Sequence, residues 1–80
     1  MNTPEIIPLR KVPTGSHVVV VHVPEGKSRS QLIRLGIHAG ELLRCLQRLP
    51  GGTMLVEKNR QEIALGASLA GSILVRMVTA

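Results

Sequence analysis

The fold is decided by the stretch LIRLGIHAG at residues 32–40, which runs directly into ELLRC at residues 41–45. Gly36 follows an apolar segment at the position where helices end in a left-handed residue, and Ile37 is placed to contact Leu32 as in a Schellman ending. The alanine–glycine step that follows predicts a tight turn. The stretch therefore indicates a short helix, a glycine stop and a turn into a strand, with nothing typical of an active site.

The helix that ends at this glycine is predicted to begin near Ser28. Ser28 and Gln31 fit a capping box, in which a serine caps the first turn and a glutamine follows three residues later. Leu32, Ile33 and Leu35 supply an apolar face. Because so short a helix is not stable alone, we expect this face to dock on a sheet.

Short segments rich in β-branched or alternating apolar residues, separated by turn residues, predict strands in the rest of the chain. They lie at residues 16–23, 41–49, 53–58, 61–65 and 73–78, with one helical or 3₁₀ turn at 67–71. The pattern predicts a mainly β fold, a small five-stranded antiparallel barrel with one short inserted helix. Residues 1–8 are expected to form an extended lead-in to a single domain at residues 9–80.

The composition limits the kinds of partner. The 80 residues include no Phe, Tyr or Trp, so the core must be aliphatic. Proline-rich peptide grooves and single-stranded nucleic-acid platforms both depend on aromatic side chains, and neither is expected here. The net charge of +5 comes from scattered Lys and Arg residues. That charge is either an ordinary solvated surface or a means of attracting an acidic partner.

No segment is apolar and long enough to predict a membrane-spanning helix, and the N-terminal residues do not resemble a signal peptide. We therefore expect a cytoplasmic protein that does not insert into the membrane.

Three histidines raise the possibility of an iron site. His17 and His22 are five residues apart on one expected strand, so they are predicted to point to opposite faces. Ferrous sites commonly use two histidines and a carboxylate. A site assembled from residues far apart in the chain stays open as an alternative, drawn from the three histidines, Glu41 and Cys45. The expectation is that the chain holds no metal and no other cofactor.

Catalytic residues are not expected either. Cys45 shares a strand face with Leu43, which predicts a small core residue and not a nucleophile. The glycine pair at 51–52 lacks the spacing of a phosphate-binding loop and precedes a strand, so it reads as a hairpin turn. The chain contains no Asp, so it has no Ser–His–Asp triad. The prediction is a protein that is not an enzyme.

Several short motifs, in order along the chain, resemble one known family. They are PL at 8–9, PxG at 13–15, LxxLGIxxG at 32–40, LxC at 43–45, PGG at 50–52, IAL at 63–65 and AxxIxV at 70–75. Together they resemble ferrous iron transport protein A (FeoA) and the SH3-like domain that ends some metal-dependent transcriptional repressors. The resemblance extends from about Pro8 to Val78.

This resemblance implies an SH3-like barrel in the bacterial cytoplasm. It also implies an accessory role in ferrous iron uptake and iron homeostasis, through protein–protein contact with the membrane transporter FeoB and its cytoplasmic GTP-binding part, at the inner face of the cell membrane. The alternative is a basic SH3-like regulatory or nucleic-acid-binding module related to the repressor domains. Scattered charge and the missing aromatic residues disfavour nucleic acid as the partner.

Two sets of residues are candidates for contact. The predicted helix displays Lys27, Arg29 and Arg34, which could meet an acidic face of the transporter; alternatively, the helix only caps one end of the barrel. Leu42 and Leu46 lie on the strand face opposite the core residues. They form either a patch for self-association into a homo-oligomer or a second packed face under the helix.

Overall fold

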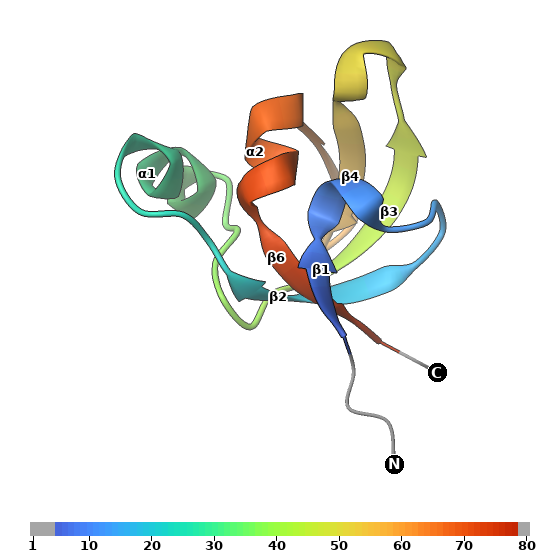
Figure 1. Cartoon of the computed structure of the whole chain (residues 1–80), viewed down its shortest axis with the longest axis horizontal. Coiled ribbons are helices and arrows are strands. Elements are labelled where there is room, and N and C mark those ends of the chain that lie inside the picture. Colours follow the sequence, from blue (N-terminus) through green and yellow to red (C-terminus); the bar gives the residue numbers. More distant parts are fainter. Residues whose placement is uncertain (1–4, 79–80) are drawn as a thin grey trace.

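A computed structural model describes residues 5–78 of the protein, and Figure 1 shows their arrangement as one strongly curved sheet with two short helices. The strands are β1 (Ile6–Pro8), β2 (His17–His22), β3 (Leu42–Arg48), β4 (Met54–Lys58), β5 (Gln61–Leu65) and β6 (Leu74–Met77). The helices are α1 (Lys27–Arg34) and α2 (Ala67–Ser72), and two 3₁₀ turns lie at Leu9–Lys11 and Pro50–Gly52.

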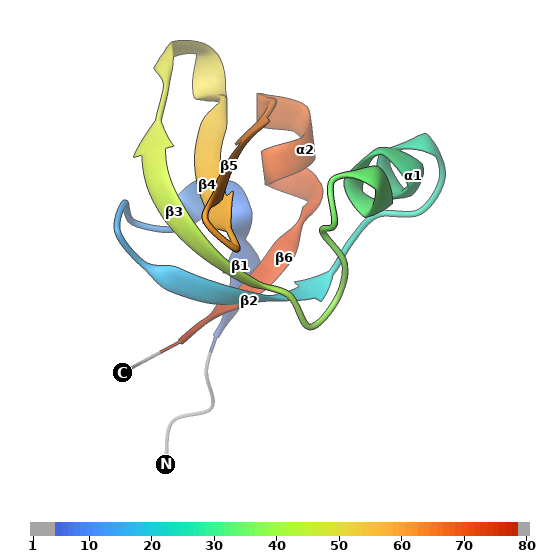
Figure 2. The ribbon, with the colours of Figure 1, turned by 180° about the vertical axis from the view of Figure 1, so that it is seen from behind.

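All strand pairs are antiparallel, and the order across the sheet is β1-β6-β2-β3-β4-β5. The mainly β, SH3-like architecture is therefore confirmed. Viewed from both sides, the sheet bends around so that β4 and β5 lie near α2, while α1 lies off to one side (Figures 1 and 2). The helical turn expected at residues 67–71 is α2, and it packs against the 3₁₀ turn at Leu9–Lys11.

The sheet has six strands where five were expected. The additional strand is β1, whose Ile6 is paired with Arg76 and whose Pro8 is paired with Leu74 of β6. The expected lead-in therefore ends as an edge strand; residues 1–4 of it lie outside the described part of the chain. An edge strand tolerates a proline because one side of it makes no ladder hydrogen bonds. Its three residues are too few to show a period of two, which is why the sequence pattern did not reveal it.

The hairpin between β4 and β5 turns at Asn59 and Arg60, whose φ angles are 51° and 68°. Positive φ at both central residues is the geometry of a type I′ turn, which matches the right-handed twist of the two strands. The turn expected at these two residues is confirmed.

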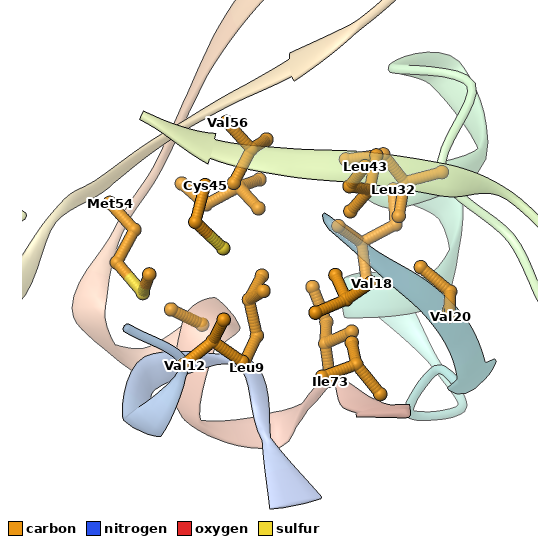
Figure 3. Packing of buried hydrophobic residues seen from close by; sticks show 14 of the residues in the cluster. Leu9, Val12, Val18, Val20, Leu32, Leu43, Cys45, Met54, Val56 and Ile73 are labelled. Atoms are coloured by element: carbon orange, nitrogen blue, oxygen red, sulfur yellow. The ribbon is translucent and has the colours of Figure 1, made fainter. Parts of the chain in front are cut away.

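The core is aliphatic, as the composition requires. Figure 3 shows side chains from β2, β3, β4 and α1 meeting those that follow β1 and precede β6. Alternate residues of β2 and β3 point inward, among them Val18, Val20, Leu43 and Cys45. Within residues 5–78, no polar or charged side chain is buried. Every charged group of this part of the chain therefore contributes to the surface.

No described helix is long and apolar enough to cross a membrane.

Candidate partner-binding surface

The first turn of α1 is set by a glycine and not by a serine. Gly26 precedes the helix with a φ of 83°, a conformation that glycine adopts without steric cost. Its carbonyl accepts hydrogen bonds from the backbone N–H groups of Arg29 (3.1 Å) and Ser30 (3.3 Å). The capping box predicted at Ser28 is wrong, because the helix begins one residue earlier, at Lys27, and no side chain caps it.

The end of α1 confirms the glycine stop. Gly36 has a φ of 79°. The backbone N–H of Ile37 donates to the carbonyl of Leu32 at 2.8 Å, and that of Gly36 donates to the carbonyl of Ile33 at 2.9 Å. These two bonds are the Schellman pair, and the buried Leu32 and Ile37 side chains are its apolar members. The chain is thereby turned from α1 toward β3.

Only one side chain of α1 is buried, Leu32. Ile33 is 55% exposed and Leu35 is 41% exposed. The expectation that all three leucine and isoleucine side chains dock on the sheet is therefore wrong for Ile33 and Leu35. Successive helical residues point about 100° apart, so Leu32 and Ile33 do not face the same neighbour. Two aliphatic side chains of this helix are left at the surface.

A basic, polar face runs along the same helix. Lys27, Ser30, Gln31 and Arg34 line an open depression, and all four are exposed. Their spacing of three, four and seven residues places them on one side of α1. No carboxylate is paired with Lys27 or Arg34 within residues 5–78. Two cations, a hydroxyl and an amide are thus available to an acidic partner.

Arg29 has a different role from the other two cations predicted for this surface. Its Nε donates to the carbonyl of Pro24 at 3.2 Å, and a terminal nitrogen donates to the carbonyl of Val23 at 3.1 Å. The side chain is half-buried. Arg29 therefore fixes the β2–α1 connection against the helix, and its expected outward display is not observed.

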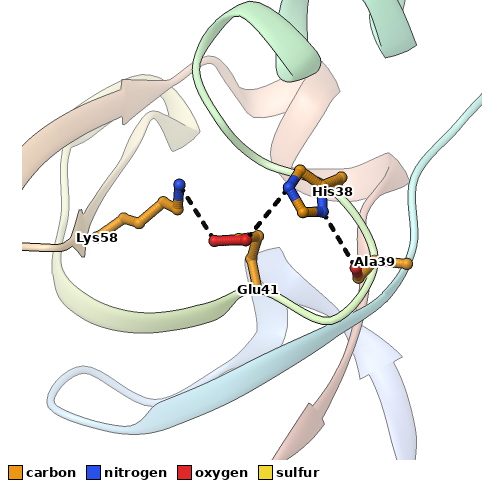
Figure 4. Close-up of polar contacts among 4 residues, drawn as sticks. All are labelled: His38, Ala39, Glu41 and Lys58. Atoms are coloured by element: carbon orange, nitrogen blue, oxygen red, sulfur yellow. Dashed lines mark hydrogen bonds and ion pairs between the residues drawn. The ribbon is translucent and has the colours of Figure 1, made fainter.

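Behind the end of α1, a small ionic network joins two parts of the sheet (Figure 4). Glu41 is paired with Lys58 at 3.1 Å and with His38 at 3.2 Å. The His38 ring also lies 3.2 Å from the carbonyl of Ala39. Lys58 and Glu41 are mostly buried, at 18% and 22% side-chain exposure. The network ties the segment between α1 and β3 to the end of β4.

The residues considered for an iron site are not gathered in one place. Within residues 5–78, no group of three or more His, Cys, Asp or Glu side chains is arranged to hold a metal ion. His17 and His22 stand exposed at the two ends of β2, and a register shift between Val20 and His22 interrupts the strand's alternation. His38 and Glu41 are paired with each other, and Cys45 is buried apart from them.

Cys45 is part of the core, as predicted. Its side chain is fully buried, and this burial raises the pKa of the thiol to about 11, opposed by the nearby Arg48 guanidinium. A thiol with so high a pKa is protonated at neutral pH and is a poor nucleophile.

Leu42 and Leu46, the residues considered for self-association, lie on the outer side of β3. Leu42 is 54% exposed and lines a shallow depression together with His17 and Glu57. Leu46 is half-buried.

The sequence pattern did not predict that Ile33 and Leu35 are exposed, or that Ser30 and Gln31 join Lys27 and Arg34 on the polar face of α1. The signal was present in part, because positions 27, 30, 31 and 34 are all polar at helical spacing. Read as one set, they mark the outward face of α1.

The model of one protein family, the FeoA domain, matches residues 7–77. A search of curated proteins finds no match. Among solved structures, the chain is similar to the crystal structure of an iron uptake regulatory protein (FeoA), with 26% identity and a TM-score of 0.83 over 92% of this chain and 99% of that one.

Two further solved structures are similar. A FeoA-like protein from Clostridium acetobutylicum shares 27% identity, with a TM-score of 0.83 over 99% of this chain and 93% of that one. A manganese-dependent transcriptional repressor shares 22% identity, with a TM-score of 0.86 over 96% of this chain but 44% of the repressor. The likeness to the repressor is one of fold.

Proposed function

Because the chain belongs to the FeoA domain family, we propose that it is an accessory protein of a bacterial ferrous iron uptake system and acts by contact with the transporter FeoB. The contact is with the cytoplasmic, GTP-binding part of the transporter, at the inner face of the membrane. In this proposal the protein catalyses no reaction of its own and carries no cofactor.

The observation that carries the proposal is the packing of α1. The helix is held to the rest of the domain by one buried side chain, Leu32, by its Schellman ending and by the Arg29 hydrogen bonds. A helix whose only role is to cap the barrel would bury its aliphatic residues, yet Ile33 and Leu35 are exposed. Exposed aliphatic side chains next to unpaired cations are typical of a surface that meets a partner.

The charges suggest the chemistry of the partner's surface. Lys27 and Arg34 would meet carboxylates, and the net charge of +5 would speed the encounter with an acidic face. Ile33 and Leu35 lie on the two flanks of this polar face and would each contact apolar side chains beside those carboxylates. The expected partner site is therefore acidic at its centre and aliphatic on either side.

The test is a binding titration between the full chain and the cytoplasmic domain of FeoB by isothermal calorimetry. The double variant Lys27→Glu with Arg34→Glu should weaken binding at least about tenfold, since it replaces two attractions with two repulsions. Ile33→Ser should weaken it by a similar factor through lost apolar contact.

Arg60→Glu is the matched control for each single reversal, Lys27→Glu or Arg34→Glu, because it makes the same change of charge on the exposed β4–β5 turn. It should leave the affinity within about twofold at moderate salt. Equal losses for Arg60→Glu and for either α1 reversal would show that only net charge matters, and unchanged affinity in the α1 variants would exclude this helix as the contact.

A further inference from the structure

A second surface lies on the outer side of the sheet, where four strands bring one residue each into a single row. The pairing register sets Ile6 of β1 opposite Arg76 of β6, Arg76 opposite Val19 of β2, and Val19 opposite Leu42 of β3. Directly paired residues share a face of a sheet. Each of the four has at least one sequence neighbour in the core or packed against it, so these four side chains point outward; the neighbours are Ile7, Val18, Val20, Leu43, Val75 and Met77.

Arg76 is surrounded by aliphatic side chains on this face. Ile6 and Val19 flank it across the sheet, while Leu74 and Val78 lie two residues away on either side along the chain. Ile6 is 51% exposed and Val78 is 41% exposed. We call this set, together with Leu42, the Arg76 face. It consists of one cation in the middle of an aliphatic surface.

The charge of Arg76 has no partner within residues 5–78, whereas another arginine of the outer sheet surface does. Arg44 of β3 lies opposite Glu57 of β4, and their side chains are 3.6 Å apart. No ion pair within the described part of the chain includes Arg76. Arg44 is thus paired within the sheet by Glu57, whereas Arg76 is available to a carboxylate of another molecule.

We propose that the Arg76 face binds a segment of a protein partner that carries one carboxylate between aliphatic side chains. An arginine ringed by apolar side chains is the composition found at the energetic centre of protein interfaces. Arg76 is exposed in the free chain. Once a partner segment covers the face, its aliphatic side chains and those around Arg76 exclude water, so a carboxylate paired with the guanidinium there makes a stronger contact than one at an open surface.

A second copy of this chain does not fit the same face well. In a two-fold dimer each patch meets itself. Arg76 is an inner member of the row, so packing centred on it would bring two guanidinium groups together without a counter-charge. The net charge of +5 on each copy adds to this repulsion.

This surface is distinct from the one on α1. The Arg76 face is built on β1, β6, β2 and the start of β3, and α1 lies to one side of these strands (Figure 1). The inference therefore goes beyond the proposed function and does not depend on it. A domain with two such surfaces could hold two partner segments at once.

The test uses the full chain and two fluorescently labelled nonapeptides, Leu-Ser-Ile-Ser-Glu-Ser-Ile-Ser-Leu and the same peptide with Gln in place of Glu, in an anisotropy titration. An arginine–carboxylate contact of moderate strength corresponds to about fivefold in affinity. The wild-type chain should therefore bind the Glu peptide about fivefold more tightly than the Gln peptide.

The variants locate the effect. Arg76→Gln should bind both peptides equally, while the control Arg44→Gln, on the same outer surface, should keep the fivefold preference. Leu42→Ser should weaken both peptides by a similar factor. The proposal is overturned if wild type shows no preference, if the preference survives Arg76→Gln, or if neither peptide binds.

Sedimentation of the unliganded chain tests the competing occupant. A monomer at all concentrations fits the proposal. A dimer that dissociates on Leu42→Ser and persists on Arg44→Gln would assign the face to a second copy of this chain and overturn it.

Discussion

Replacing Gly36 with alanine should destabilise the protein by two separable effects. The first is conformational, because Gly36 has a φ of 79° and a left-handed conformation costs an L-residue about 1–2 kcal/mol. The second is steric. A Cβ at this position would lie 2.7 Å from Nζ of Lys58, which is held at 3.1 Å from Glu41.

The Lys58 ammonium can move away from the new methyl group, so the steric effect is the loss of its ion pair with Glu41. Because both side chains are still partly in contact with water, this amounts to about 1 kcal/mol. The free energy of unfolding should therefore fall by about 2–3 kcal/mol in Gly36→Ala, of which about 1 kcal/mol depends on Lys58. In a domain of this size such a loss lowers the melting temperature by roughly 10 °C or more.

The assay is urea unfolding followed by far-UV circular dichroism, since the chain has no Trp or Tyr to report by fluorescence. Gly36→Ala is measured in the wild type and in Lys58→Met, which forms a double-mutant cycle. The control is Gly15→Ala, at a φ of 92° with no atom within 4 Å of the added Cβ. Its cost should be purely conformational and equal in both backgrounds.

Two outcomes would refute this reasoning. A cost of Gly36→Ala that is the same in wild type and Lys58→Met would show that the lysine does not lie against this glycine. A negligible cost in both backgrounds would show that the left-handed helix ending is not required.

Three further predictions concern other parts of the molecule. Because burial raises the pKa of the Cys45 thiol to about 11, the unfolded chain loses this proton at lower pH than the folded one, and stability should fall by about 1 kcal/mol per pH unit between pH 9 and 11. Denaturant titrations over this pH range give the free energy of unfolding as a function of pH. It should fall more steeply with pH in the wild type than in Cys45→Ala, and equal slopes in the two proteins would contradict the prediction. Arg60→Gly should stabilise the β4–β5 hairpin by about 1 kcal/mol, because Arg60 holds a φ of 68° that glycine adopts freely; thermal melts should show a higher midpoint than for Arg60→Ala, and equal midpoints would argue against the type I′ turn. Arg48→Met should lower the free energy of unfolding by about 1–3 kcal/mol, because the Arg48 guanidinium donates to the backbone carbonyls of Arg10 and, at 3.0 Å, Val12. An unchanged unfolding midpoint would show that these hydrogen bonds contribute nothing to stability.

Turns and strand alternation made most of the sheet predictable. The glycine stop at Gly36 and the two-residue turn at Asn59 have local causes, a left-handed backbone and a tight hairpin, which single residue types report. The inward positions of β3, among them Leu43 and Cys45, follow from a period of two. These features depend on a few neighbouring residues, so the sequence carries them directly.

The missed features depend on tertiary structure. The strand β1 is three residues long and exists because β6 is available to pair with it. Ser28 satisfied a local capping pattern, but Gly26 allowed the helix to begin earlier. The exposure of Ile33 depends on how far α1 stands from the sheet, which no periodicity reports.

The candidate surfaces were predictable to different degrees. Lys27 and Arg34 were expected to point outward from the helical spacing, and they do so. The Arg76 face is built from four separate strands, and the register between them is set by turns, a bulge and the edge strand. No local pattern links residue 6 to residue 76, so the surface becomes visible only in the folded protein.

The central claim is that this domain works through contact made by α1. It is tested most directly by two-dimensional ¹H–¹⁵N NMR spectra of the labelled full chain as the cytoplasmic domain of FeoB is added. The account predicts that the largest losses and shifts of amide signals fall between Lys27 and Ile37, with the interior strands little changed. No change at any concentration, or changes that leave this segment untouched, would contradict it.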